Sequence, residues 1–318
     1  MSERLAAWAY TAGWRFVRIL PERMAYLLFS MAAEFTWLRQ GSGVRQLEAN
    51  LARVFPDASA MKLKSLSRKG MHSYMRYYCD VFRLNDWSTE RVLATCRAEG
   101  EGQVRTALAE GRGAIVALGH SGNWDHAGAW STLALAPVTT VAERLRPEVV
   151  FQRFLTVRQQ LGMEILPLTG GGEDVFRVLV RRLRKGGFVP LLADRDLSAN
   201  GVPITLFGET ARMAAGPAAL AVITGSALHP VSLHYERLGP GAPARWGIVI
   251  TFHPEVPVPA EGTRAERIAS MTQSCADALA VGIREHPQDW HMLQRVFVAD
   301  LVPTPGEPHG VRAGAGSS

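Results

Sequence analysis

Short apolar runs alternate with stretches of helical periodicity from residue 113 onward. The first run, Ala114–Leu118, stops at Gly119-His120, a pattern typical of a buried strand. Because strands alternate with helices, residues 113–300 are predicted to form an α/β fold, with a mixed, largely parallel central sheet flanked by helices. The other predicted strands cover 138–141, 164–168, 188–193, 227–233 and 246–252. The predicted helices cover about 150–162, 174–186, 214–225 and 264–285.

The first 110 residues have a different texture, with apolar residues at helical spacing. Two helices are predicted over residues 4–40, separated at Pro21, and the second is expected to run from Glu22 to Arg39. Residues 45–110 are predicted to be helical throughout, because their apolar residues recur three or four positions apart. The N-terminal part is therefore expected to add helices rather than strands to the fold.

Aromatic residues lie beside arginines in the two helices of residues 4–40. This pattern is typical of interfacial helices that enter lipid head groups, although helices that pack on the rest of the domain can show it too. The longest apolar run, Met24 to Ala33, is too short to cross a bilayer, and the features of a cleaved signal peptide are missing. We therefore expect an N-terminal helical membrane-associating segment that does not span the membrane.

The composition suits one domain, expected over residues 1–303. Of the 318 residues, 47% are hydrophobic and 20% are charged, which is apolar enough for a sizeable core. The tail after Pro303 is rich in Gly, Pro and Ser, so residues 304–318 are predicted to be disordered. The three widely spaced cysteines suggest neither a disulfide framework nor a structural zinc site, and they fit a reducing compartment.

The formal net charge of +6 favours anionic partners, which include nucleic acid, acidic lipids and phosphorylated cofactors. Nucleic acid is disfavoured, because the basic residues are scattered and no recognition motif accompanies them. An anionic membrane surface or a phosphorylated ligand is the expected partner.

A histidine and an aspartate, His120 and Asp125, follow directly after the first predicted strand. The ends of strands in such sheets face the binding crevice, where reactive side chains collect. If a helix begins near Ser121 or Asn123, Asp125 lies in its first turn and can face back toward His120. The carboxylate would hold one imidazole nitrogen and leave the other free to accept a proton. A helix-capping aspartate beside a structural histidine would give the same pattern.

A second pair of carboxylates, Asp194 and Asp196, emerges where another buried strand ends. One of them can reach His120 if the two strands are neighbours. An Asp–Arg turn that only caps the following loop is an equally good interpretation.

Four charged residues are candidates for binding a substrate. Glu143 and Arg144 follow a predicted strand, and Arg158 lies on a predicted helix. Arginines near a crevice suit phosphate groups, although a solvated helix face explains many arginines as well. Arg212 is expected at a loop-to-helix junction, where backbone N–H groups and the helix dipole can hold an anion.

Several other chemistries lack their motifs. The sequence has no GxxxxGK[ST] loop, no GxGxxG after a strand and no HExxH, and the Gly119 segment lacks the final glycine of a nucleophile elbow. No convincing metal cluster is present, so neither a metal nor a cofactor is expected.

The segment from His120 to Asp125 resembles the HX4D motif of the bacterial lipid A late-acyltransferase superfamily. The chain most resembles the phosphatidylinositol mannoside acyltransferases of actinobacteria. Further blocks that carry this resemblance are 50–55, 140–145, 166–171, 193–197, 207–213 through 224–225, and 289–294. Together they extend over about residues 8 to 300, and they are far more specific than the His–Asp pair.

The resemblance implies a fatty acyl chain, expected to be palmitoyl, donated by acyl-CoA to a mannose hydroxyl of a phosphatidylinositol mannoside. The enzyme would be peripheral, at the cytoplasmic face of the plasma membrane. The catalytic histidine maps onto His120 and the motif aspartate onto Asp125. The acidic residue that orients the histidine maps onto Asp194, at a position often occupied by Glu, so Asp125 remains the alternative. A lysophospholipid or lipid A-type acceptor, or a non-catalytic lipid-binding protein, are the rival interpretations.

Overall fold

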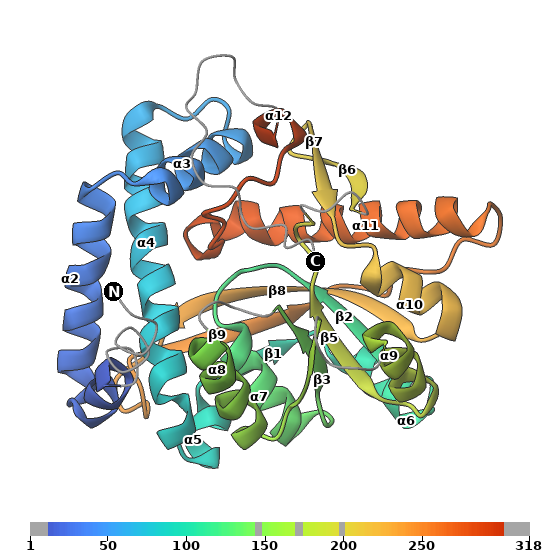
Figure 1. Ribbon diagram of the computed structural model, residues 1–318, viewed down its shortest axis with the longest axis horizontal. Helices are drawn as coiled ribbons and strands as arrows, with labels where there is room; N and C mark the ends of the chain where they lie inside the picture. Colours follow the sequence, from blue (N-terminus) through green and yellow to red (C-terminus); the bar gives the residue numbers. More distant parts are fainter. Residues whose placement is uncertain (1–11, 144–147, 169–173, 197–200, 302–318) are drawn as a thin grey trace.

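The computed structural model of the chain describes residues 12–143, 148–168, 174–196 and 201–301 (Figure 1). The predicted disordered tail of residues 304–318 and the first part of the predicted N-terminal helix lie outside these residues.

A five-stranded mixed sheet forms the centre of the fold (Figure 1). In order across the sheet, the strands are β1 (Cys96–Glu99), β9 (Trp246–Phe252), β8 (Ala227–Arg237), β2 (Ala114–Leu118) and β5 (Phe188–Leu192). β2 pairs in parallel with β5 and β8, and β1 pairs in parallel with β9, while β8 and β9 are antiparallel. The predicted mixed, largely parallel sheet is therefore confirmed.

Both faces of the sheet are covered, which explains why β2 is apolar along its whole length. Ile115 and Ala117 point into a core shared with α10 (Gly216–Thr224) and α11 (Arg264–Glu285). Val116 and Leu118 point the opposite way, into a core shared with α7 (Trp124–Ala134). This alternation along one strand decides which side chains face α7, where the candidate site lies.

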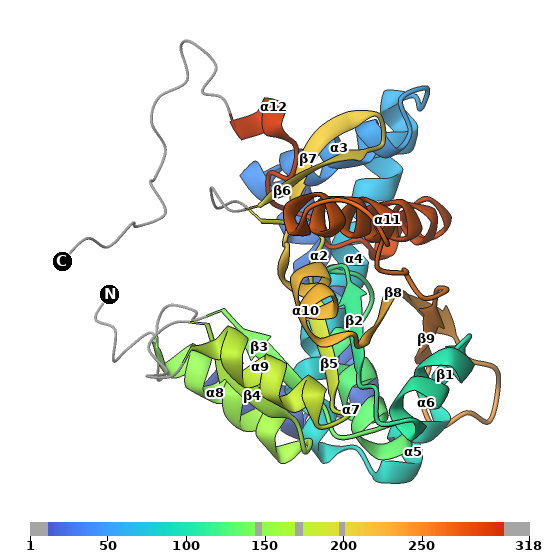
Figure 2. The same ribbon diagram turned by 90° about the vertical axis from the view of Figure 1, so that its right-hand side faces the viewer.

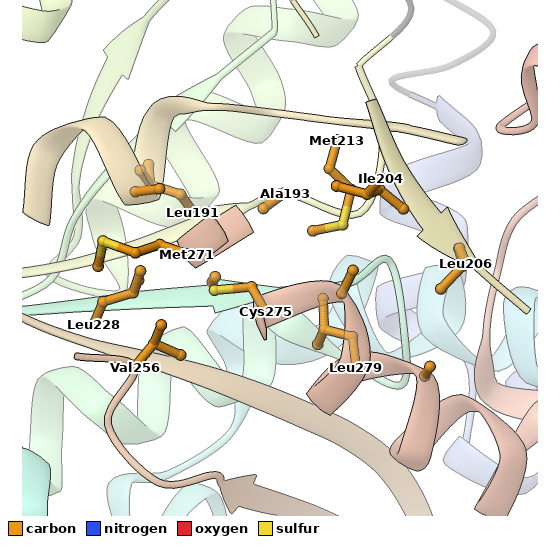
Figure 3. Packing of buried hydrophobic residues seen from close by; sticks show 14 of the residues in the cluster. Leu191, Ala193, Ile204, Leu206, Met213, Leu228, Val256, Met271, Cys275 and Leu279 are labelled. Carbon is orange, nitrogen blue, oxygen red and sulfur yellow. The ribbon is translucent and has the colours of Figure 1, made fainter. Parts of the chain in front are cut away.

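A hairpin of β6 (Val202–Leu206) and β7 (Glu209–Met213) packs on α11, as Figure 3 shows for Ile204, Leu206 and Met213. The apolar runs do not predict this hairpin, because polar and apolar residues alternate in both short strands. The same hairpin accounts for an error in the predicted position of Arg212, which lies on β7 rather than at the start of a helix.

A second strand pair lies beside the edge strand β5 (Figure 2). β3 (Thr139–Ala142) and β4 (Glu164–Pro167) are parallel, and Val138 forms a bridge to Phe188. The helices that follow these strands are α8 (Glu148–Gln160) and α9 (Val175–Arg184). Both strands and both helices were predicted within a few residues of their observed bounds.

The N-terminal part is mostly helical, and the predicted break at Pro21 is confirmed. Residues 12–19 are helical, and α2 starts directly after Pro21. The prediction that residues 45–110 are helical throughout is wrong at β1, whose four residues join the sheet edge beside β9. The helices here are α2 (Glu22–Leu38), α3 (Ser42–Val54), α4 (Ala60–Arg83), α5 (Thr89–Ala94) and α6 (Gly102–Ala109). The remaining elements are the 3-10 turns Leu84–Asp86 and Pro287–Asp289, and α12 (Val298–Leu301).

Helix α11 approaches β8 closely at Gly282. A Cβ atom built on Gly282 would lie 2.2 Å from the Ser232 Oγ atom, so any side chain there forces the helix away from the strand. We predict that Gly282→Ala lowers the free energy of unfolding by about 1–3 kcal/mol, as overpacking does. Gly216→Ala is the matched control, because a Cβ at Gly216 would contact nothing within 4 Å. Equal stability of the two variants in urea denaturation would contradict this packing.

Candidate active site

A cavity of about 600 Å³ opens between α7 and the sheet face that carries Val116 and Leu118. One part of its wall is charged and the rest is almost entirely apolar. The charged wall consists of His120, Asp125, Glu143, Arg158, Arg195 and Asp196. The apolar wall includes Val116, Leu118, Ala127, Val138, Met163, Phe188, Leu192, Val231, Leu233, Ile250 and Phe252.

His120 follows β2 and holds Asp194, which follows the neighbouring strand β5. Its ring Nδ1 lies 2.6 Å from Asp194 Oδ1, and its backbone N–H donates to Asp194 Oδ2 at 2.9 Å. With Nδ1 engaged by a carboxylate, Nε2 is the ring nitrogen left to accept a proton. His120 also lines the cavity, so the structure has the arrangement of a histidine general base that is oriented by a carboxylate.

The Asp194 carboxylate is buried and receives three hydrogen bonds. The third comes from the Trp290 indole, whose Nε1 lies 3.1 Å from Asp194 Oδ2. Burial alone would raise the pKa of Asp194, but the charge and hydrogen bonds of His120, together with the Trp290 bond, hold this pKa below its ordinary value. Asp194 is therefore ionised at neutral pH, although it is 2% exposed.

Asp125 binds Arg158 and Tyr77, and no hydrogen bond joins its side chain to His120 among the described residues. Arg158 contacts both carboxylate oxygens, at 2.5 and 3.1 Å, and the Tyr77 hydroxyl donates to Oδ2 at 2.8 Å. The sequence left open which aspartate orients His120, and the geometry gives this position to Asp194. Burial of Arg158 works to lower its pKa, but the charge of Asp125 and its hydrogen bonds raise the pKa overall. Asp125 thus keeps a charged guanidinium in the cavity wall.

The short loop between His120 and α7 is shaped by Gly122 and Asn123. Gly122 has φ +56°, and a Cβ there would lie 3.0 Å from the backbone carbon of Leu233, so only glycine fits without strain. Asn123 caps α7, because its side chain accepts from the His126 N–H at 3.0 Å. The helix start that the sequence allowed near Ser121 or Asn123 is present, and Asp125 lies in the first turn of α7, although its side chain binds Arg158 and Tyr77.

The other predicted substrate-binding residues have mixed outcomes. Glu143 lines the cavity, is largely exposed, and lies 3.7 Å from Arg195. Arg144 lies outside the described residues. Arg212 is not among the residues that line the cavity, and its backbone carbonyl accepts from the Asp196 N–H at 2.9 Å.

Sequence reasoning assigned no role to Arg195, Tyr77 or Trp290. Arg195 appeared only in an Asp–Arg turn and in the block 193–197, and Tyr77 only as one aromatic residue in a helical pattern. Trp290 belongs to the block at residues 289–294, and this block was the only sequence signal for its importance.

Comparison with known proteins gives consistent results. The bacterial lipid A biosynthesis acyltransferase family matches residues 1–298. A phosphatidylinositol mannoside acyltransferase of Mycolicibacterium smegmatis is 42% identical over 292 residues, covering 92% of this chain and 91% of that protein. Proteins of the same name from two strains of Mycobacterium tuberculosis are 43% identical over 296 and 297 residues, covering 92% of this chain and 89% of each.

Among solved structures, the 1-acyl-sn-glycerophosphate (LPA) acyltransferase from Thermotoga maritima has a TM-score of 0.36 and 14% sequence identity. The alignment covers 83% of this chain and 97% of that chain, and a similarity this low carries no inference about the site. The family match and the identity to the mycobacterial proteins extend over almost the whole length. The chain therefore belongs to the bacterial lipid A biosynthesis acyltransferase family.

Proposed function

We propose that the protein transfers a fatty acyl chain from acyl-CoA to a mannose hydroxyl of a phosphatidylinositol mannoside. The observation that carries the chemistry is the His120–Asp194 pair at the wall of an apolar cavity. The acceptor is proposed from the mycobacterial relatives, whose names specify a phosphatidylinositol mannoside.

In this proposal His120 Nε2 removes the proton of the mannose hydroxyl while that oxygen attacks the thioester carbonyl carbon. The tetrahedral intermediate then collapses, the C–S bond breaks, and the CoA thiolate accepts the proton from His120. Asp194 keeps the ring oriented and stabilises the imidazolium that exists between these two proton transfers. A thioester is already activated, so the acyl group passes directly to the acceptor without a covalent enzyme intermediate.

Arg158 and Arg195 are proposed to bind the anionic parts of the two substrates. Both guanidinium groups line the cavity together with His120. Arg158 is held by Asp125, and Arg195 lies 3.7 Å from Glu143. A planar guanidinium suits the phosphates of CoA and the phosphodiester of a phosphatidylinositol, which carry the same chemistry.

The acyl chain is proposed to lie in the apolar part of the cavity, between α7 and the sheet. From Asp194 back to Phe188 the chain covers six residues, or roughly 20 Å at about 3.3 Å per residue. An extended acyl chain advances about 1.25 Å per carbon, because C–C bonds of ~1.5 Å zigzag at tetrahedral angles. The apolar wall therefore follows most of a strand from Phe188 to Leu192, a run that suits a long acyl chain such as the proposed palmitoyl group.

Membrane association is proposed for the outer face of α2, at the cytoplasmic face of the plasma membrane. This face carries an unbroken row of exposed apolar side chains, and exposed arginines flank it. No helix in the described part of the chain is long and apolar enough to cross a bilayer. A row of this kind suits insertion among anionic head groups. Its members are Met24, Leu27, Leu28, Met31, Phe35 and Leu38.

The function is tested with radiolabelled palmitoyl-CoA and three acceptors: phosphatidylinositol mannosides, lysophospholipids and a lipid A precursor. We predict label on the mannosides, and a loss of roughly 10²–10⁴ in rate for His120→Gln, as expected for a general base. His72→Gln is the control, because His72 lies on α4 and contacts Glu34 and Ser30 instead.

Label on a different acceptor would support acyl transfer but contradict the phosphatidylinositol mannoside as the acceptor. Unchanged turnover in His120→Gln would reject His120 as the base. Tight acyl-CoA binding without transfer to any acceptor would favour a non-catalytic lipid-binding protein.

Acyl-chain length is tested at Ser131, a buried residue of α7 that lines the cavity about two helical turns beyond Trp124. We predict that Ser131→Leu shifts the ratio of kcat/KM for lauroyl-CoA over palmitoyl-CoA upward by at least about tenfold, because the added side chain shortens the cleft. Leu133→Phe is the control on the exposed side of the same helix. An equal loss with both donors would contradict this placement of the acyl chain.

Membrane binding is tested by co-sedimentation with vesicles of phosphatidylglycerol and phosphatidylcholine. The double variant Leu27→Glu/Met31→Glu is expected to bind roughly tenfold more weakly or worse, since two apolar side chains no longer enter the lipid. Leu133→Glu, which changes an exposed leucine elsewhere, should bind as the wild type does. Undiminished binding of the double variant would place the membrane contact on another face.

A further inference from the structure

The segment Asp289–His291 lies against the loop that carries His120. Trp290 forms an antiparallel bridge with Ser121. The His291 N–H donates to the His120 carbonyl at 2.8 Å, and the Gly122 N–H donates to the Asp289 carbonyl at 2.9 Å. The backbone on both sides of the base is therefore tied to a segment about 170 residues further along the chain.

This segment is itself held by several distant elements. The Asp289 side chain accepts from the Ser73 hydroxyl and, at 3.1 Å, from the Tyr235 N–H. Directly after the segment, the Met292 carbonyl accepts a hydrogen bond from the Asn50 side chain at 2.8 Å. Because α3, α4 and β8 all contribute to these bonds, the backbone of the segment has little freedom to move.

The Trp290 side chain is fully buried and reaches from this segment to Asp194. Phe207 packs edge-on against it, with ring centroids 6.1 Å apart. Phe207 has φ +52°, a conformation that bulky residues adopt only where the surrounding structure determines it. The indole is thus supported by packing, and its Nε1–H points at the carboxylate oxygen that also receives the His120 backbone N–H.

We propose that Trp290 is a positioning residue for the acyl transfer: its indole N–H fixes the Asp194 carboxylate and limits how strongly Asp194 holds the proton on His120. The kinetic consequence rests on the proposed function, whereas the protonation of His120 can be measured without any substrate.

The direction of the effect follows from the hydrogen bonds. A donor to a carboxylate stabilises its charge and draws that charge away from its other partner. Without the indole N–H, Asp194 attracts the imidazolium of His120 more strongly, and the pKa of His120 rises. More of the base is then protonated at a given pH, and the carboxylate also loses one of its three fixed contacts.

The test is an NMR titration of the full-length protein with labelled histidine, in which His120→Gln identifies the His120 signals. Trp290→Phe should raise the pKa of His120 by about half a unit to one unit. The acid limb of the profile of kcat/KM against pH should move to higher pH by the same amount. At pH values below the pKa of His120, kcat/KM therefore falls roughly 3- to 10-fold. An unchanged or lowered pKa of His120 would overturn the proposal, even if activity falls.

Two controls separate this effect from general loss of an indole. Trp87→Phe should change neither quantity, because the Trp87 indole N–H has no hydrogen-bond partner among the described residues. In an Asp194→Asn background, Trp290→Phe should no longer shift the pKa of His120, since the carboxylate through which it acts is gone. An equal shift in both backgrounds would mean that Trp290 acts by another route.

If Trp290→Phe does not fold, benzothienylalanine at position 290 replaces it, because sulfur then takes the place of the N–H in a ring of similar size. The same upward shift is expected. The titration of His120 needs no substrate. It therefore tests the role of Trp290 even if the phosphatidylinositol mannoside proves not to be the acceptor.

Discussion

The burial of the Asp194 charge is the constraint on which the rest of the site depends. An ionised carboxylate away from water is tolerated only when several donors surround it. Here two donors come from His120 after β2, and the third comes from Trp290 near the C-terminus. Strands β2 and β5 must therefore be neighbours, and the segment at Trp290 must return across the end of the sheet. Gly119 completes the arrangement, because a Cβ there would lie 3.2 Å from Asp194 Oδ2.

The same sheet face that provides the base also provides the apolar cleft. Val116 and Leu118 point toward α7, and His120, two residues further on, lines the same cavity. Trp124, at the start of α7, contacts the His120 ring edge-on, with centroids 5.6 Å apart. The alternation along β2 thus places a proton acceptor in the wall of an apolar cavity, which is what acyl transfer to a lipid hydroxyl requires.

Much of the fold was predictable because its elements have strong periodicity. The strand at 246–252 and the helix at 264–285 match the observed bounds, whereas β1, with its exposed Arg97 and Glu99, has too few apolar residues to be recognised. In the site, the position of His120 after a strand made it a candidate, and the resemblance to the acyltransferase family selected it as the base. The sequence could not decide between Asp125 and Asp194, because that choice depends on which strand lies beside β2. The block at 289–294 pointed to Trp290, but its hydrogen bond to Asp194 could not be predicted, since it joins residues 96 positions apart.

The central claim is that Asp194 orients His120 and tunes it as the base. Its most direct test is the pH dependence of kcat/KM for wild type and Asp194→Asn, with one acyl-CoA and one mannoside. Loss of the carboxylate should lower the plateau by roughly 10³–10⁴, as for other histidine bases that lose their aspartate. It should also move the acid limb to lower pH, because the imidazolium loses its counter-charge. A profile with the wild-type plateau and acid limb would contradict the account.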